Sequence, residues 1–314
     1  MSQDPLEAQP GIAARSPLQL FWRRLRHDRV ALAAAAFIVL LALVAILAPL
    51  VVDLVGARPP NEQSKEFLDS FGTPTGPSAH NIFGVDTLGR DVFSRVIYGA
   101  RVSLEVAIIA TALSVTLGVV VGMVAGYYRG WVDAVLSRFI DVLLAFPILL
   151  LALGLASACS LGNGCLGGTV QPGLSVVIFV IAFVNWTYIA RIIRGQVLSL
   201  REKEFVEAAR ALGASNRRII FREILPNLVA PIIVYTTLII PTNILFEAAL
   251  SFLGVGVQPP DASWGAMLAD ATGIFDTAWW YMVFPGAALL LTVLAFNLLG
   301  DGLQDALNPR AGKS

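Results

Sequence analysis

The chain has 314 residues, of which 56% are hydrophobic and only 14% charged, and its mean hydropathy is +0.73. These values lie outside the range of soluble globular domains and indicate a membrane protein. The formal net charge is zero, and this balance gives no support to nucleic-acid binding.

Apolar stretches of spanning length recur along the chain. A transmembrane helix needs about 20 apolar residues to cross a hydrocarbon core of about 30 Å. The first stretch lacks the small-residue pattern of a cleavable signal peptide, so we expect a retained anchor. The sequence therefore predicts an all-α polytopic membrane protein with six transmembrane helices, approximately over residues 30–52, 103–127, 139–158, 174–190, 228–253 and 279–300.

The basic residues indicate the orientation of these helices. If the N-terminus lies inside, 17 of the 22 Lys and Arg residues fall on the cytoplasmic side, as the positive-inside rule requires. An odd number of spans would place basic residues 191–222 and 310–313 on opposite sides. We therefore predict that both termini are cytoplasmic, with residues 1–29 and 307–314 as tails.

Residues 53–100 are predicted to form an external loop. Its first part, 53–80, contains four prolines, which suits an exposed loop. Asp86 or Thr87 can then cap a helix whose apolar residues recur with helical spacing. This pattern predicts an amphipathic helix at the membrane interface before the second span, and a solvated linker helix is the alternative.

The two cysteines, Cys159 and Cys165, share one short loop after the third span. The predicted topology places that loop outside the cytoplasm, where disulfides persist. We predict a disulfide that closes the loop, and a pair of free thiols is the alternative.

The segment EFVEAARALGASNRRIIFREILPN (204–227) is dense in charge but lies between two apolar runs. Ser199 and the glutamate three residues later have the spacing of a capping box, which predicts a helix that ends near Gly213. A second helix is predicted to begin around Ser215 or Asn216 and to run to Leu225, where Pro226 ends it.

The first of these helices has the composition of a docking element. Ala208, Ala209 and Gly213 are small enough to let another backbone approach closely. Glu207 and Arg210 supply charges that can fix the register of a partner. An ordinary interfacial helix with a solvated charged face is the alternative.

Several stretches carry a resemblance to a known family. The residues Glu207-Ala208-Ala209, Gly213 and Ile224-Leu225-Pro226 resemble the EAA loop of importer-type ABC permeases, although the isoleucine follows one position later than in the family pattern. In that family the loop docks in a cleft of the ATPase subunit. Nearly the whole chain resembles the C-type permease of dipeptide and oligopeptide importers. The resemblance is clearest in FGVDTLGRDVFSR (83–95), EAALSFLGVGVQPPDASWG (247–265) and NLLGDGLQDALNP (297–309).

The resemblance implies a type I ABC importer permease fold, with a core of five spans over residues 101–306 and a cytoplasmic EAA loop over 195–227. It implies ATP-driven import of dipeptides or oligopeptides across the bacterial cytoplasmic membrane by alternating access. Nickel complexes, glutathione and antimicrobial peptides are the alternative cargoes. The implied partners are a homologous B-type permease, two ATPase subunits that bind ATP and Mg²⁺, and an external substrate-binding protein.

The sequence offers no candidate for catalysis by the chain itself. The tail AGKS (311–314) mimics the end of a Walker A loop, but Leu307 stands where the first glycine is needed. The two histidines, His27 and His80, are predicted on opposite sides of the membrane, so they form neither a metal site nor a Ser-His pair. We predict a transporter subunit without enzymatic activity, resident metal or cofactor.

Polar residues inside the predicted spans are candidates for the transport pathway, because such groups are costly in a bilayer. They are Asn185, Thr236, Asn243 and Glu247. Glu247 has a second interpretation, as a buried structural acid paired with Arg101 or with the backbone. A secondary transporter coupled through Glu247 and a scaffold subunit are the rival functions.

Overall fold

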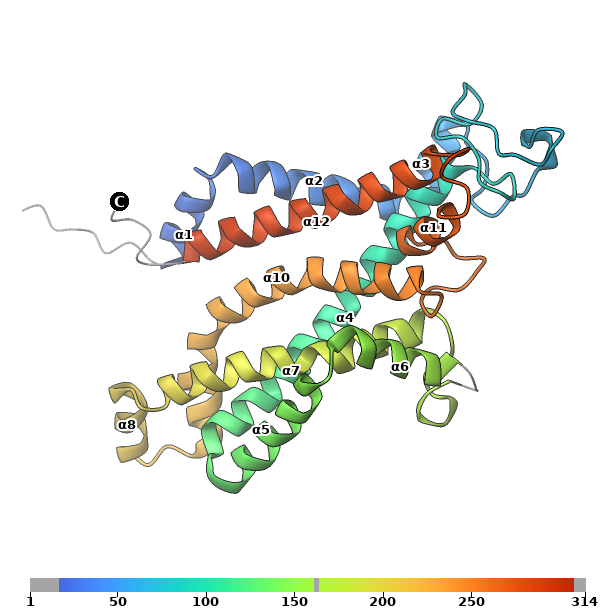
Figure 1. Ribbon diagram of the computed structural model, residues 1–314. Helices are drawn as coiled ribbons and strands as arrows, with labels where there is room; N and C mark the ends of the chain where they lie inside the picture. The colour runs from blue at the N-terminus through green and yellow to red at the C-terminus, as the bar shows by residue number, and fades with distance from the viewer. Residues whose placement is uncertain (1–16, 161–163, 308–314) are drawn as a thin grey trace, which may run out of the picture.

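The computed structural model describes residues 17–160 and 164–307 and is built from helices. Helices α2, α12, α10 and α7 lie side by side, and α4 crosses them (Figure 1). The helices are α1 (Pro17–Leu25), α2 (Arg29–Ile46), α3 (Ala48–Val55), α4 (Val92–Tyr128), α5 (Gly130–Ala145), α6 (Ile148–Ser160), α7 (Leu174–Leu200), α8 (Glu204–Ala211), α9 (Asn216–Arg218), α10 (Leu225–Phe252), α11 (Trp264–Ala271) and α12 (Trp280–Leu307), with short elements η1 (Lys65–Phe67), η2 (Leu166–Gly168) and η3 (Ile219–Ile224).

Within the described residues, five continuous helices are long and apolar enough to cross a membrane, and α5 with α6 forms a sixth, bent unit. The two helices of this unit meet at 89°, whereas the sequence predicts one straight span over 139–158. Phe146 is extended at the break, with φ −82° and ψ 141°. Pro147 follows it, and a proline disfavours helical backbone in the residue before it.

The second span also differs from its prediction. Val92–Tyr128 is one continuous helix, so no separate interfacial helix lies between residues 83 and 100. The N-cap residue of α4 is Asp91, whose Oδ1 accepts from the amide of Phe93 at 2.8 Å, rather than Asp86 or Thr87. Asp86 instead closes the preceding turn, where its Oδ1 accepts from the Arg90 amide at 3.0 Å.

The charged segment 204–227 departs from the predicted pair of helices as well. Ser199 lies inside α7, and α8 begins only at Glu204 with no side-chain cap. After the turn at Gly213, residues Asn216–Phe252 form one helical path that passes through Pro226. The η3 segment of this path is a π-helix. Its wider i→i+5 bonding ends at Leu225, directly before the proline, which has no amide proton to donate.

Helix α4 packs closely on α7. Gly118, Gly122 and Gly126 repeat every four residues along the α4 face toward α7. A Cβ at Gly122 would lie 2.6 Å from the carbonyl oxygen of Ala190, which is too close. Small residues at such spacing let two membrane helices approach closely and gain van der Waals contact.

Residues 56–91, here called the cap, fold over one end of the helices (Figure 1). The indole Nε1 of Trp280 in α12 donates to the Val85 carbonyl at 3.0 Å, and Ser94 Oγ in α4 donates to the Arg58 carbonyl at 2.5 Å. Burial raises the pKa of the Asp91 carboxyl, although the Phe93 amide opposes this shift. The cap is therefore packed onto α4 and α12.

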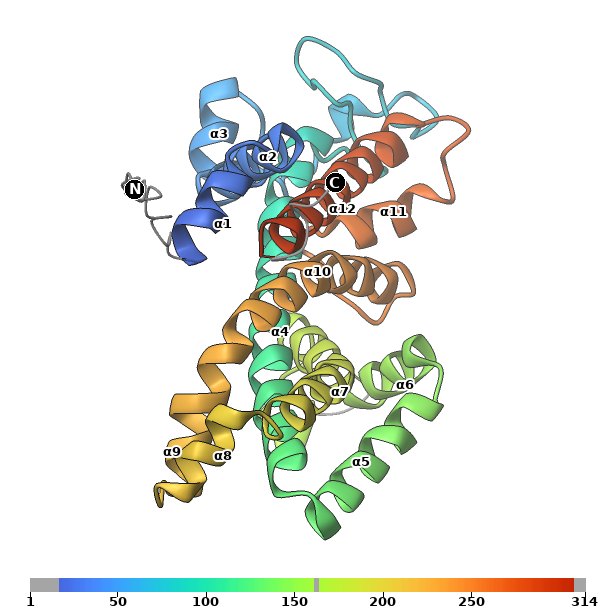
Figure 2. The same ribbon diagram turned by 90° about the vertical axis from the view of Figure 1, so that its left-hand side faces the viewer.

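The positions of the helices distinguish two ends and two sides of the molecule. Helices α1 and α8 lie at the end opposite the cap and α11 (Figure 1). Figure 2 shows α2 and α12 on one side and the bent α5–α6 unit on the other, with α4, α7 and α10 between them.

Candidate functional site

Helix α8 projects from the end of the molecule opposite the cap and is anchored there by one buried side chain. Val206 is fully buried and packs in a core cluster with Ile219, Ile224 and Leu228. The sequence places this valine two residues after the start of α8. One anchor fixes the helix to the bundle and leaves its other faces open.

The predicted docking residues occupy the open part of α8 and its turn. Glu207, Ala208, Arg210 and Gly213 are exposed, and Ala209 is half-buried. Gly213 has φ +79°, a left-handed conformation that glycine adopts without steric cost. No atom of another residue lies within 4 Å of the Cβ position at Gly213, so the space beside it is free.

Two apolar side chains add to this surface in a way that the sequence does not predict. Phe205 is 40% exposed and Leu212 is 89% exposed. Phe205 and Leu212 are apolar like Val206 and lie in the same predicted helix, but of the three side chains only Val206 is buried. An exposed leucine beside the left-handed turn makes a small apolar tip, here called the α8 tip (Phe205, Leu212 and Gly213).

Polar contacts tie the flanks of α8 to the end of α4. The hydroxyl of Tyr127 donates to Asn216 Oδ1 at 2.8 Å, and Arg201 Nη1 donates to the Tyr127 carbonyl. Arg129 pairs with Glu202 at 2.5 Å. This last pair is exposed and adds little energy. These contacts hold the segments before and after α8 against the same helix terminus.

The predicted pathway residues Asn185 and Asn243 meet inside the helix bundle. Asn185 Nδ2 donates to Asn243 Oδ1 at 2.6 Å, and Asn243 Nδ2 donates to Thr111 Oγ1 at 2.7 Å. All three side chains are buried. The chain of bonds joins α7, α10 and α4.

Glu247 lies further along α10 and is fully buried. Its two carboxylate oxygens accept from the hydroxyls of Ser103 at 2.8 Å and Ser251 at 2.7 Å. The structure therefore gives Glu247 serine partners, whereas the sequence suggests Arg101 or the backbone. Ser103 belongs to α4, so the contact joins α10 to α4.

A cavity of about 360 Å³ lies between α7, α10 and the bent α5–α6 unit. Of the four predicted pathway residues, Asn185 borders this cavity. Asn243 and Glu247 face α4 instead, and the hydroxyl of Thr236 donates to the Ile232 carbonyl of its own helix at 2.7 Å. A pathway role for these four residues stays a prediction. The lining also contains Leu144, Ile148, Tyr188, Tyr235, Leu238, Ile239, Thr242 and Phe246.

Cys159 and Cys165 lie close together at the cap end of α6, with 4.8 Å between their Cα atoms. This Cα separation falls within the range that disulfides require. Residues 161–163 between them lie outside the described residues. The disulfide itself stays a prediction.

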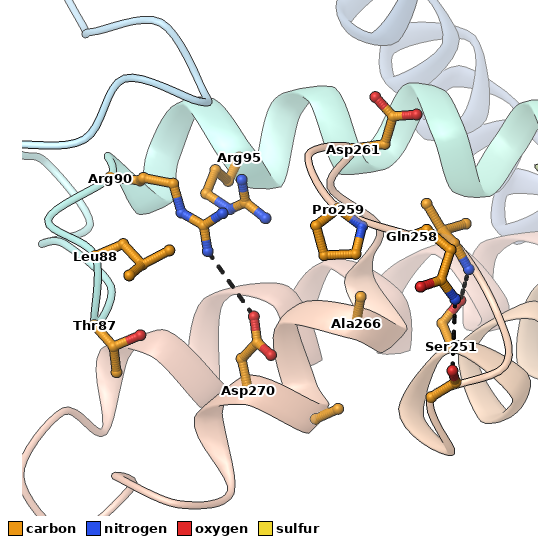
Figure 3. A pocket seen from close by; sticks show the side chains of 13 residues that line it. Thr87, Leu88, Arg90, Arg95, Ser251, Gln258, Pro259, Asp261, Ala266 and Asp270 are labelled. Atoms are coloured by element: carbon orange, nitrogen blue, oxygen red, sulfur yellow. Dashed lines mark hydrogen bonds and ion pairs between the residues drawn. The ribbon is translucent and has the colours of Figure 1, made fainter. Parts of the chain in front are cut away.

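A second cavity, of about 420 Å³, opens at the cap end between the turn before α4, the loop 254–261 and α11. The sequence does not predict it. Figure 3 shows Arg90 and Arg95 on one wall and Asp270 on the facing wall. The turn before α4 is distant in sequence from the loop and α11, so these segments meet only in the fold. We call this cavity the cap pocket.

Comparisons with known proteins identify the family. Residues 118–313 match the family of binding-protein-dependent transport system inner membrane components, and residues 16–68 match the N-terminal transmembrane domain of oligopeptide transport permease C. The glutathione transport system permease protein GsiD of Escherichia coli O157:H7 is 44% identical over 296 residues, which cover 94% of this chain and 91% of that protein. GsiD of Shigella sonnei (strain Ss046) has the same identity and coverage.

Solved structures show the same fold. An inward-facing conformation of the MetNI methionine ABC transporter matches with a TM-score of 0.58 and 18% identity, covering 69% of this chain and 97% of that chain. An amino acid ABC transporter crystallised with histidines matches with a TM-score of 0.52. At this identity the likeness concerns the fold alone. The chain belongs to the binding-protein-dependent inner membrane components and is the permease subunit of an ABC importer of the dipeptide and oligopeptide family.

Proposed function

We propose that this subunit imports short peptides, with glutathione as the first cargo to test. The observation that carries the proposal is the 43–44% identity to glutathione permeases over nearly the full length of both chains. Peptides are the wider class, because the N-terminal domain matches that of oligopeptide permease C.

The α8 end of the molecule is the cytoplasmic end in this proposal, and the cap faces outward. The distribution of Lys and Arg supports this orientation, since it predicts both termini inside. The N-terminal helix α1 and the end of α12 lie at the same end as α8 (Figure 1). The described part of the chain therefore begins, in α1, and ends, in α12, at the same end of the molecule as the proposed docking element.

Energy comes from two separate ATPase subunits that bind ATP and Mg²⁺, and α8 docks against one of them. The exposed α8 tip supports this role, because a leucine that is 89% exposed gains contact area when a partner covers it. A homologous B-type permease and an external binding protein complete the proposed assembly.

The mechanism is alternating access, and the helices transmit the motion. Helix α8 follows α7 after three residues, and beyond its turn the helical path Asn216–Phe252 leads directly into α10. Both α7 and α10 border the 360 Å³ cavity. A displacement of α8 by the ATPases therefore moves two walls of that cavity, while Val206 keeps α8 attached to the bundle.

Uptake by the assembled transporter in proteoliposomes tests the proposal. A mixed peptide pool is offered with ATP inside the vesicles, or with a proton gradient alone, and the captured cargo is identified by mass spectrometry. We expect ATP-dependent accumulation of short peptides. Uptake driven by the gradient without ATP would contradict the proposal and favour a secondary transporter coupled through Glu247.

A substitution at Gly213 tests the proposed coupling role of α8. Replacing Gly213 by leucine forces a side chain into the left-handed conformation, at a cost of roughly 1–2 kcal/mol, and adds bulk to the docking surface. We expect Gly213→Leu to insert into the membrane normally and to lose peptide-stimulated ATPase activity. Gly213→Asn is the matched control, because asparagine tolerates this conformation. Normal stimulation in Gly213→Leu would argue against docking through α8.

A further inference from the structure

The cap pocket has one positively charged wall. Arg90 Nε lies 2.6 Å from Asp86 Oδ2, and Arg95 Nε lies 3.7 Å from the same oxygen. Asp86 is fully buried and Arg95 is 3% exposed. Two guanidinium groups thus share one carboxylate, which neutralises only one of them. Arg95 Nε also has no hydrogen-bond partner among the described residues.

The facing wall carries the carboxylate of Asp270, which can accept further hydrogen bonds. Asp270 Oδ2 lies 4.0 Å from Arg90 Nη2, beyond hydrogen-bond distance. Asp270 accepts from the Tyr281 hydroxyl at 3.1 Å, and half of its side-chain surface is exposed. Within residues 17–160 and 164–307, the terminal nitrogens of Arg90 donate no hydrogen bond. Opposite charges with free capacity therefore face the same gap (Figure 3).

We propose that the cap pocket binds the α-amino-acid head group of the cargo, in which an ammonium and a carboxylate are attached to one carbon. The carboxylate accepts two N–H bonds from Arg90, for which a guanidinium has the right geometry. The ammonium donates to Asp270. In such a head group the nitrogen and the carboxylate oxygens lie roughly 3 Å apart, as bond lengths dictate. Because Arg90 Nη2 and Asp270 Oδ2 are 4.0 Å apart, the head group bridges them from the open side of the pocket, with one end on each partner.

The proposal rests on the proposed function and makes it more specific. A γ-glutamyl peptide such as glutathione keeps its ammonium and α-carboxylate on one carbon. An ordinary tripeptide carries them at opposite ends, separated by up to roughly 3.3–3.6 Å per residue. The cavity volume of about 420 Å³ falls in the range for small ligands. The pocket therefore favours γ-linked over α-linked peptides.

Two tripeptides of identical composition test this selectivity: γ-Glu-Cys-Gly and α-Glu-Cys-Gly. ATP-driven uptake of each is measured in proteoliposomes with the binding protein saturated by that tripeptide, so that selection by the binding protein does not enter. We expect the wild-type transporter to favour the γ-linked form. Asp270→Asn should reduce its uptake by about tenfold, the effect of one charged hydrogen bond, and leave the α-linked form within about twofold.

Two further variants make the result interpretable. Arg90→Lys keeps the positive charge beside Asp86 but removes the two-pronged contact, and we expect the same loss of selectivity. Asp276→Asn is the matched control, because Asp276 is exposed on the neighbouring α11–α12 connection outside the pocket. Its uptake ratio should equal that of the wild type.

Equal uptake of both tripeptides by the wild type would overturn the inference, and so would an equal loss of both in Asp270→Asn and Arg90→Lys. If the transporter imports other peptides but neither form of Glu-Cys-Gly, the inference falls while the proposed function stands. Absence of ATP-dependent uptake of any peptide would overturn both.

Discussion

Single residues distinguish the proposed docking surface from the contacts that hold the bundle together. Val206 lies in α8 and Leu212 directly follows its last residue, yet the valine is fully buried and the leucine is 89% exposed. Burying one leucine at an interface is worth about 1.5–3 kcal/mol. The exposed leucine is therefore the residue of α8 with most to gain from a partner.

We expect Leu212→Asp to weaken docking of the ATPase subunits without disturbing the permease. The leucine has little contact to lose within the chain, whereas a carboxylate on an apolar interface is costly to desolvate. The expected loss of stimulated ATPase activity is about tenfold or more. Leu212→Met keeps the apolar bulk and should retain activity. Wild-type ATPase activity in Leu212→Asp would exclude the α8 tip from the interface.

Asn243 is the residue on which three helices converge. Asn243→Ala should lower the stability of the permease by about 1–2 kcal/mol, because Asn185 and Thr111 each lose a partner inside the membrane. The measurement is thermal unfolding of the purified subunit in detergent. Thr242→Ala is the control, since that side chain is exposed and its hydroxyl bonds only within α10. Equal unfolding temperatures for the two variants would contradict the structural role.

At the scale of elements, the packing of α4 on α7 and the bend between α5 and α6 determine the shape. The glycine face of α4 brings two backbones together, and the 89° bend turns α6 back along α7. Salt bridges from Arg191 to Asp141 and from Arg194 to Asp133, each 2.5 Å, connect α7 to α5. The Arg191 pair is exposed and adds little energy, and the Arg194 pair is the more buried of the two. The 360 Å³ cavity exists because α5 and α6 diverge from a straight span.

Gly122→Leu should disrupt the contact between α4 and α7. Even a Cβ at this position meets the Ala190 carbonyl at 2.6 Å, and overpacking of a tight core costs about 1–3 kcal/mol or more. We expect less folded protein in the membrane, measured by fluorescence-detected gel filtration. Gly154→Leu is the control on α6, where no atom lies within 4 Å of the Cβ position. A normal yield of Gly122→Leu would show that this contact is adaptable.

For the whole molecule, the cap and α8 mark opposite ends, and transport requires that they face opposite sides of the membrane. Helices of the permease connect the two ends without interruption, most directly Asn216–Phe252. The proposed cargo site at the cap pocket and the proposed docking site at the α8 tip lie at these two ends, and the same helices connect them.

Labelling of single cysteines tests this orientation in a variant that lacks Cys159 and Cys165. We expect a membrane-impermeant maleimide to label Ser70→Cys in the cap of intact spheroplasts. Ala211→Cys on α8 should react only after permeabilisation, because both positions are exposed and the proposed topology places them on opposite sides of the membrane. Labelling of Ala211→Cys in intact spheroplasts would invert the proposed topology.

The two native cysteines test the predicted loop closure. In the wild type we expect no maleimide incorporation at Cys159 or Cys165 until a reductant is added, because a disulfide has no thiolate to react. The measurement is the mass of the peptide that contains both residues, before and after reduction. Incorporation without reductant would show free thiols.

The sequence by itself determined the class of protein, the number of apolar segments, the position of α8 and the family. These properties are local: hydropathy over about 20 residues suffices for a span, and the motif around Glu207 lies within one segment. The sequence predicted the ends of individual helices less accurately, as at Ser199, Asp86 and Pro226. There, packing and the π-helix of η3 override the local capping and proline signals.

Only the tertiary structure decided which polar residues meet. Asn185 and Asn243 are 58 positions apart and Ser103 and Glu247 are 144 positions apart, yet both pairs are in hydrogen-bond contact. The cap pocket likewise depends on Arg90 and Asp270, which no local pattern relates. Contacts between distant segments follow from how helices pack on one another, and helix packing depends on the side chains of every neighbour at once.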